Sequence, residues 1–299
     1  MECKFCGSEN TIKNGVRKDI QDWLCKDCNH KFRENWGLIG MKTPRVVVGN
    51  AIQMYYNGIP MTSIDEQIKA IYDHKVNSST IWRWVMKYSN RSYDFLSHYP
   101  AKLGDVWMVD ETQVKIRGRP AWFWDVIDTD TRFLVGTHLS YTRTISDVTL
   151  LFKKCKVRSL TKPKVIISDS MPAYHKGINK VFYSTHKDKR TEHILMQGMD
   201  KPININMLER FHGTIKQRYK VMRGLKTFDS TQTILDGFVT HYNYFKPHQA
   251  LKDKTPSEMA GVTRTYDNWI SLLEYMDRES TNKPIRANIS KEILNHYDE

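Results

Sequence analysis

The pattern of apolar positions along the chain changes near residue 100. Between residues 45 and 91 apolar side chains recur every three or four positions, which predicts amphipathic helices separated by turns at 57–60 and 73–77. After Pro100, short apolar runs rich in strand-forming residues alternate with further helical stretches. The expected strands are 106–109, 121–127, 133–137, 164–168 and 193–196, and the expected helices are 145–157, 172–181, 204–222 and 231–245. This order predicts a mixed α/β sheet flanked by helices, preceded by a small all-α module.

Composition and charge narrow the class of protein. The chain has 299 residues, with 46 Lys and Arg against 33 Asp and Glu, and a net charge of +13. Such an excess favours a polyanionic partner, most often nucleic acid, although a merely basic protein is the alternative. The apolar run 46–48 is far shorter than the roughly 18 residues of a membrane span, and no signal peptide is evident. We therefore expect an intracellular, cytoplasmic protein with no membrane partner.

Four of the five cysteines fall within the first 28 residues, in two Cys-x2-Cys pairs. Two such pairs can complete a tetrahedral shell of thiolates around one structural Zn²⁺ ion, and metal binding then largely folds so small a module. The alternatives are a redox motif, which needs only one pair, or cysteines paired by chance. We expect a zinc ribbon over residues 1–35, with the ligands Cys3, Cys6, Cys25 and Cys28. Cys155 stands alone, and we interpret it as a packing residue.

Two short helices joined by a tight turn within residues 45–92 match a helix-turn-helix DNA-binding domain. The second helix would begin at residues 78–80, where Ser and Thr are good N-caps. Ser79, Arg83 and Lys87 follow at steps of four, so they share one face that suits contact with a DNA groove. Ile81, Trp82 and Val85 would pack behind that face. A plain helical hairpin is the alternative interpretation.

Three acidic residues stand out by their position. Asp110 follows the apolar run 106–109, Asp169 follows the run 165–168, and Glu209 lies within the expected helix 204–222. A carboxylate at the end of a buried strand is costly unless it is paired or bound to metal. Two strand-end carboxylates and one helical carboxylate can converge on Mg²⁺, which accepts a few carboxylates and keeps water and phosphate as its other ligands. The alternative is that all three are caps or surface residues.

The helix that carries Glu209 is strongly basic. It has an apolar stripe that would face the sheet and a neighbouring stripe that runs from Glu209 past Lys216 to Lys220. Six Lys and Arg side chains lie between residues 204 and 226, against the single acid Glu209. We expect Lys216, Arg218 and Lys220 to contact the phosphate backbone of DNA without reading its sequence.

These residues together resemble the DDE transposases of bacterial and archaeal insertion sequences. The resemblance covers about residues 104–261 and rests on four motifs: Val-Asp110-Glu111-Thr-Gln-Val-Lys, Ile167-Ser-Asp169-Ser-Met-Pro-Ala-Tyr174, Asn206-Met-Leu-Glu209-Arg-Phe-His212-Gly-Thr-Ile-Lys216-Gln-Arg218, and Tyr242-Asn243-Tyr-Phe-Lys-Pro247-His248. Neighbours in a strand point to opposite faces, so only one of Asp110 and Glu111 can serve as a ligand. The resemblance favours Asp110.

The resemblance implies an RNase H-like, retroviral-integrase-like catalytic core, here residues 102–262, with a tail at 263–299 to which we assign no role. It implies DNA cleavage and strand transfer with two Mg²⁺ (or Mn²⁺) ions held by Asp110, Asp169 and Glu209. The partners would be double-stranded DNA, both the element ends and the target, and further copies of the chain. His212 and His248 are expected to be structural or to contact phosphate. Two other classes stay open, namely a domesticated DNA-binding regulator without catalysis and a Mg²⁺-dependent nuclease on the same fold.

Overall fold

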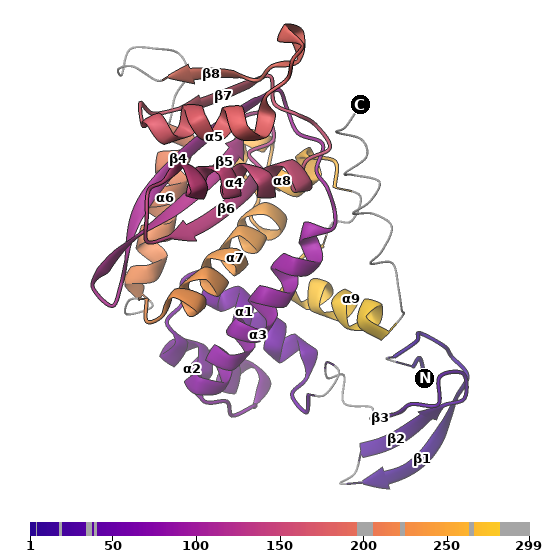
Figure 1. Ribbon diagram of the computed structural model, residues 1–299. Coiled ribbons are helices and arrows are strands. Elements are labelled where there is room, and N and C mark those ends of the chain that lie inside the picture. Colours follow the sequence, from indigo (N-terminus) through magenta and orange to yellow (C-terminus); the bar gives the residue numbers. More distant parts are fainter. Residues whose placement is uncertain are drawn as a thin grey trace. The chain divides into compact units, whose positions relative to one another are not determined.

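The computed structural model describes residues 1–3, 5–17, 20–33, 38, 41–195, 206–221, 225–262 and 266–281. The chain divides into two compact units. Unit 1 takes in the described residues of 1–88 together with 266–281, and unit 2 takes in those of 89–262. Figure 1 shows the elements of both units. In the described part of the chain, no helix is both long enough and apolar enough to cross a membrane.

Unit 1 begins with a three-stranded antiparallel sheet in the order β1-β2-β3. Its strands are β1 (Thr11–Arg17), β2 (Ile20–Cys25) and β3 (Lys31–Arg33). The sheet is small, and the only cluster of buried apolar residues around it contains Cys3, Cys25 and Phe32 among the residues described. A core of this size does not stabilise a sheet by itself, which fits a module that a metal ion folds.

The rest of unit 1 is helical. Its helices are α1 (Arg45–Tyr56), α2 (Met61–Tyr72), the first part of α3 (Ser78–Ser97), and α9 (Trp269–Thr281). α9 packs on α1, and the Tyr56 and Trp269 rings are stacked 5.4 Å apart. A Cβ atom on Gly49 would lie 2.5 Å from Cγ1 of Ile270, so the close approach of α1 and α9 needs glycine at this position. The tail to which we assigned no role thus contributes a helix to unit 1.

Unit 2 is built on a five-stranded mixed sheet in the order β6-β5-β4-β7-β8. The first three strands in the chain form an antiparallel meander, and β7 and β8 run parallel to β4. The strands are β4 (Val106–Ile116), β5 (Arg119–Asp128), β6 (Leu134–Ser140), β7 (Val165–Ser168) and β8 (Glu192–Leu195). All five lie at or next to the positions that the apolar runs predict, although β4 extends to Ile116 as one arm of a long hairpin.

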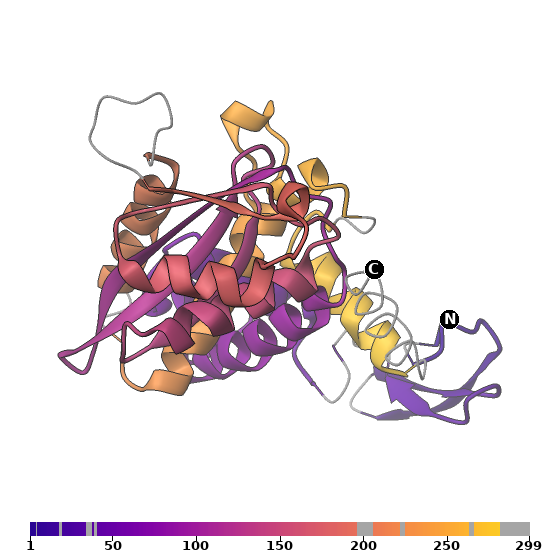
Figure 2. The same ribbon diagram turned by 45° about the horizontal axis from the view of Figure 1, so that its top comes forward.

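Helices pack on the sheet of unit 2. The principal ones are α4 (Ile145–Arg158), α5 (Pro172–Phe182), α6 (Asn206–Val221) and α7 (Phe228–Phe245), with the short α8 (Pro256–Met259) beside α7. α4 and α5 lie side by side (Figure 2), and Gly177 allows their close contact at Val148. Successive residues of β5 point to opposite faces of the sheet and contact different helices. Trp124 contacts Tyr174 of α5, whereas Phe123 contacts Phe211 of α6. The predicted mixed sheet flanked by helices is confirmed.

Candidate active site

The parallel pairing of β4 with β7 places two of the predicted acids at the same edge of the sheet. Met108 pairs with Ile167, so Asp110 and Asp169 each lie two residues beyond a paired position. Asp110 continues β4, whereas Asp169 directly follows the end of β7. The carboxylate of Asp169 accepts a hydrogen bond of 3.0 Å from the Met171 amide, which holds it at the start of the turn into α5.

A third carboxylate, Glu111, joins this edge. Asp110, Glu111 and Asp169 each offer one oxygen atom, and these atoms all lie within 4.8 Å of one another. We call these three residues the acidic cluster. Strand alternation therefore does not keep Glu111 away from this site, because its longer side chain reaches the cluster. Which of Asp110 and Glu111 would bind metal stays a prediction, in favour of Asp110. Carboxylate oxygens are hard ligands, so the cluster suits Mg²⁺ or Mn²⁺.

Glu111 differs from the other two acids because both of its oxygens have partners within the protein. Arg143 forms an ion pair with one oxygen, and the Tyr174 hydroxyl donates a hydrogen bond to the other. The Arg143 guanidinium also lies over the Trp122 ring, 4.2 Å from its centroid. Burial, and then the Glu111 carboxylate, raise the pKa of Tyr174 well above its usual value, so the hydroxyl stays a donor. Sequence reasoning did not single out Arg143 and Tyr174.

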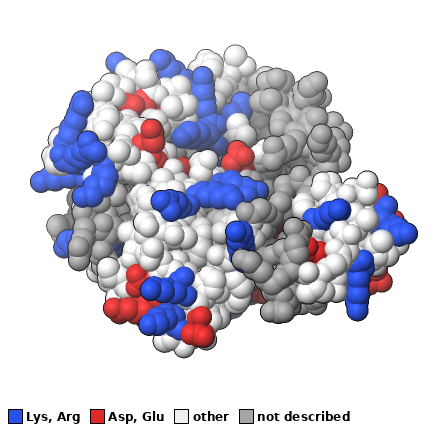
Figure 3. Space-filling model, turned by 90° about the horizontal axis from the view of Figure 1, so that it is seen from below, with Lys and Arg blue, Asp and Glu red and all other residues white. Residues whose placement is uncertain are grey.

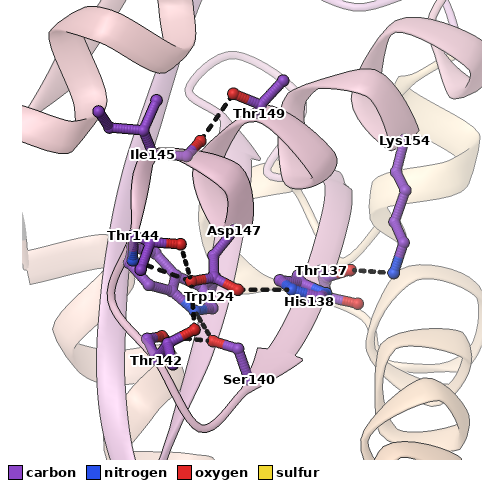
Figure 4. Close-up of polar contacts among 10 residues, drawn as sticks. All are labelled: Trp124, Thr137, His138, Ser140, Thr142, Thr144, Ile145, Asp147, Thr149 and Lys154. Atoms are coloured by element: carbon purple, nitrogen blue, oxygen red, sulfur yellow. Dashed lines mark hydrogen bonds and ion pairs between the residues drawn. The ribbon is translucent and has the colours of Figure 1, made fainter.

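The turn that carries Arg143 is held by hydrogen bonds on both sides of it. The Asp147 carboxylate accepts bonds from the Thr142 hydroxyl and from the amide and hydroxyl of Thr144, at 2.7–2.8 Å (Figure 4). These bonds cap α4 at its first turn. They fix the chain on either side of Arg143 and so fix the direction from which it reaches Glu111.

Glu209, the third predicted acid, lies outside the acidic cluster. It is exposed in the first turn of α6, and the cluster found among the described residues does not include it. His212 lies three residues further along the same helix, about 4.5 Å along its axis, and contacts Asp110. The structure therefore brings together two of the three predicted acids and places the third about one helical turn from His212, which contacts Asp110.

A buried histidine lies between Asp110 and a second aspartate that sequence reasoning missed. Nε2 of His212 is 2.6 Å from Oδ1 of Asp125, and Nδ1 is 3.7 Å from Oδ2 of Asp110. Burial, and then the Asp125 charge, raise the pKa of Asp110 to about 7. Burial lowers the pKa of His212, but the Asp125 and Asp110 carboxylates outweigh it, and the net shift is upward. The signal for this pairing was a single acid, Asp125, inside the otherwise apolar run 121–127.

The four N-terminal cysteines form a second cluster, in unit 1. One sulfur atom from each of Cys3, Cys6, Cys25 and Cys28 lies within 4.8 Å of the others, and the Cys3–Cys28 and Cys6–Cys25 pairs are each 3.6 Å apart. Hydrogen bonding from the Cys28 amide lowers the pKa of Cys25 to about 7, which favours the thiolate that binds metal. Four convergent soft donors fit one Zn²⁺ ion. Cys155 is fully buried in unit 2, as expected for a packing residue.

The predicted DNA-contact residues lie on exposed parts of two helices. Ser79, Arg83 and Lys87 are all exposed along α3. Ile81 and Val85 are buried behind them as expected, but the buried tryptophan is Trp84 rather than Trp82.

On α6, Lys216 and Lys220 are exposed and Arg218 is half-buried. Lys and Arg side chains dominate the charged surface in Figure 3, which agrees with the net charge of +13. Lys216 and Lys220 are therefore accessible to solvent, and their contact with DNA stays a prediction.

Comparison with known proteins finds a family model and several relatives that are similar to parts of this chain. A family model described as a DDE domain matches residues 104–248, which contain Asp110, Asp169 and Glu209. The chain is 25% identical over 181 residues to the transposase for the insertion sequence-like element IS431mec of Staphylococcus aureus. This alignment covers 58% of this chain and 73% of that protein. It is 22% identical over 197 residues to the uncharacterized protein MJ0017 of Methanocaldococcus jannaschii, and this alignment covers 64% of this chain and 83% of that protein.

Among solved structures, the HTLV-2 integrase catalytic core domain in complex with magnesium matches 54% of this chain and 99% of that domain. The TM-score is 0.42 and the sequence identity is 17%. The resemblance that the sequence motifs indicated is confirmed by the DDE-domain match and by the relatives among insertion-sequence transposases.

Proposed function

Since residues 104–248 match a DDE domain and the chain is similar to insertion-sequence transposases, we propose that this protein is a DDE transposase. It binds the ends of an insertion sequence and catalyses Mg²⁺-dependent DNA cleavage and strand transfer. The observation that carries the proposal is the meeting of Asp110 and Asp169 at one edge of the sheet, with His212 of α6 in contact with Asp110.

The acids Asp110, Asp169 and Glu209 would hold two Mg²⁺ or Mn²⁺ ions, and the cysteine cluster would hold one Zn²⁺ ion. When bound, a pair of Mg²⁺ ions activates the attacking water or 3′-hydroxyl and neutralises the charge on the leaving oxygen. Two of the three acids already meet, and the exposed Glu209 side chain would complete the set from α6. Glu111 would keep its bonds to Arg143 and Tyr174 and support the other two.

The basic residues hold the substrate. Lys216 and Lys220 follow Glu209 along one side of α6, so a DNA backbone that contacts them passes beside Glu209, and Arg218 would contact phosphate from the other side of the helix. In unit 1, the exposed face of α3 would contact the element ends through Ser79, Arg83 and Lys87. Two ends must be held together for transposition, so we expect a homo-oligomer on DNA.

The test incubates zinc-loaded protein and Mg²⁺ with DNA that carries the inverted repeats flanking the gene. Strand-transfer products support a transposase, cleavage alone indicates a nuclease, and a bandshift without products indicates a regulator. Asp169→Ala should abolish the products and leave the bandshift unchanged, because it removes a carboxylate of the acidic cluster and no DNA contact.

A matched control is Asp105→Ala. Asp105 precedes the other end of β4 and forms an exposed ion pair of 2.7 Å with Lys164 next to β7. This variant removes a carboxylate beside the same two strands but far from the acidic cluster, so it should retain strand transfer. Loss of activity in both variants would show that any disturbance of these strands inactivates the protein, and would count against the assigned role of Asp169.

A further inference from the structure

Two aspartates face each other across the central strands of unit 2. Asp110 on β4 pairs directly with Asp125 on β5, so their side chains lie on the same face of the sheet. Asp125 is fully buried, and its Oδ2 atom has no hydrogen-bond partner among the described residues. Like charges in directly opposed positions destabilise a sheet, and a buried carboxylate is costly without a partner. A third group must therefore compensate this arrangement.

His212 of α6 is that group. Its side chain is 8% exposed, and its two ring nitrogens contact different carboxylates, Asp125 at 2.6 Å and Asp110 at 3.7 Å. Nε2 makes the short contact with Asp125, so the two ring nitrogens have different carboxylate partners. The other nitrogen, Nδ1, then faces the carboxylate that the proposed function assigns to metal binding.

The residue before His212 on α6 packs on β5 through apolar contacts alone. Phe211, next to His212, packs on Phe123 of β5 and on Phe238 and Tyr242 of α7. Apolar residues thus suffice to hold α6 on this face of the sheet. Replacement of a buried ion pair by apolar residues of similar volume is often neutral or stabilising, so packing alone does not explain a histidine and an aspartate at this place.

We propose that Asp125 and His212 form a positioning pair for the acidic cluster. Asp125 fixes the orientation of the imidazole, and the imidazole holds the Asp110 carboxylate toward Asp169. The inference rests on the proposed function, since it assigns the pair to the same site. Because His212 is one turn from Glu209, the pair also sets how close the first turn of α6 lies to Asp110.

A second histidine–carboxylate pair in the same unit serves as a comparison. Nε2 of His138 on β6 lies 3.5 Å from Oδ1 of Asp147, whose carboxylate also accepts three bonds at the start of α4 (Figure 4). The pair joins strand β6 to the first turn of α4, and neither residue is part of the acidic cluster. His138→Gln is therefore a matched control for His212→Gln.

The test measures Mn²⁺ binding to the zinc-loaded full chain by electron paramagnetic resonance, together with the thermal midpoint and a DNA bandshift. His212→Gln keeps a donor to Asp125 and loses the nitrogen that faces Asp110. Mn²⁺ affinity should fall by about 10–100-fold, the usual effect of losing a group that orients a metal ligand, with the midpoint and the bandshift nearly unchanged. A purely structural role would leave Mn²⁺ affinity as in the wild type.

Asp125→Asn supplies an independent variant in case the histidine variant does not fold. It keeps the shape of the side chain but removes the charge that orients the imidazole, and it should weaken Mn²⁺ binding in the same way. His138→Gln should leave Mn²⁺ affinity unchanged. An equal loss in His138→Gln, or wild-type affinity in every folded variant of the pair, would overturn the inference.

The proposed function can fail separately from the positioning pair. If Asp169→Ala leaves Mn²⁺ binding unchanged, the acidic cluster does not bind the metal and the proposed function is wrong. If Asp169→Ala abolishes Mn²⁺ binding while the pair variants bind normally, only the positioning role is wrong.

Discussion

The cysteine cluster of unit 1 contains all of its predicted metal ligands, whereas the acidic cluster of unit 2 contains only some of them. All four predicted cysteines meet, whereas only two of the three predicted acids do, with Glu209 outside the cluster. The cysteines lie within 26 residues of one another and belong to one small module. The acids come from two strands and a separate helix. The difference matches two kinds of metal site, since a structural site is closed by protein ligands and a catalytic site keeps room for water and substrate.

Among the variants considered, loss of a cysteine ligand should have the largest effect on folding and metal binding. Cys25→Ser removes one of four thiolates, and structural Zn²⁺ sites supply an apparent free energy of about 10–16 kcal/mol. We expect loss of bound zinc by elemental analysis and at least a tenfold weaker bandshift with element-end DNA. Mn²⁺ binding by the acidic cluster should not change. The control Cys155→Ala removes a buried thiol outside the cluster and should retain zinc.

The helical part of unit 1 is tested by Trp269→Ala. The Trp269 side chain is fully buried on α9 and stacked on Tyr56 of α1. Truncation of a buried tryptophan costs about 3–5 kcal/mol, so unit 1 should unfold at lower temperature in calorimetry while unit 2 is unaffected. Trp82→Ala, at a half-buried position of α3, should cost less. A single transition that shifts as a whole would show that the units do not unfold independently.

Glu209→Gln separates catalysis from stability in unit 2. The side chain is exposed, so the free energy of unfolding should change by less than about 0.5 kcal/mol. Strand transfer should fall by about 100- to 1,000-fold, the range seen when an enzyme loses one electrostatic group of its active site. Glu192→Gln replaces another exposed glutamate of the unit, on β8, and should have no effect. Full activity of Glu209→Gln would show that two acids suffice and that Glu209 is a surface residue.

The smallest effect is expected on the DNA-contact face of α3. Arg83→Ala should weaken binding to element ends by about 1–3 kcal/mol and reduce the preference over scrambled DNA in competition bandshifts. Lys87→Ala should weaken both kinds of DNA alike if it contacts phosphate. Lys69→Ala, at an exposed position of α2, serves as the control. Unchanged selectivity in Arg83→Ala would remove α3 as the element that reads sequence.

The positions of Asp110 and Asp169 were predictable because their signal is local, although Asp110 lies within β4 and not at its end. Asp110 and Asp169 each follow an apolar run, and the parallel pairing of those runs brings their ends to one edge of the sheet. The contact between His212 and Asp125 was not predictable in this way. These residues are 87 positions apart, and their contact depends on how α6 packs on β5. The long reach of Glu111 from the opposite face of β4 was missed because strand alternation describes Cβ direction and not side-chain length.

The sequence of α9 contains a helical pattern of apolar residues that our prediction did not use. Trp269, Leu272, Leu273 and Met276 are buried and follow the three- and four-residue spacing of an amphipathic helix. The polar residues around them led us to interpret the region as a tail. The strands β1–β3 were missed for a different reason, since a module folded by metal needs few apolar positions and carries little strand pattern.

The position of α9 in the chain has a consequence for biosynthesis. A ribosome moves from the N-terminus to the C-terminus, so residues 89–262 emerge and can fold before α9 exists, while α1 waits for a partner that is more than 200 residues downstream. A transcript cut short before the codons of α9 would therefore yield polypeptides with a complete sheet in unit 2 and with the apolar face of α1 that packs on α9 exposed. Chaperones bind and proteases degrade chains with exposed apolar surface, so truncated products that lack α9 would be removed preferentially.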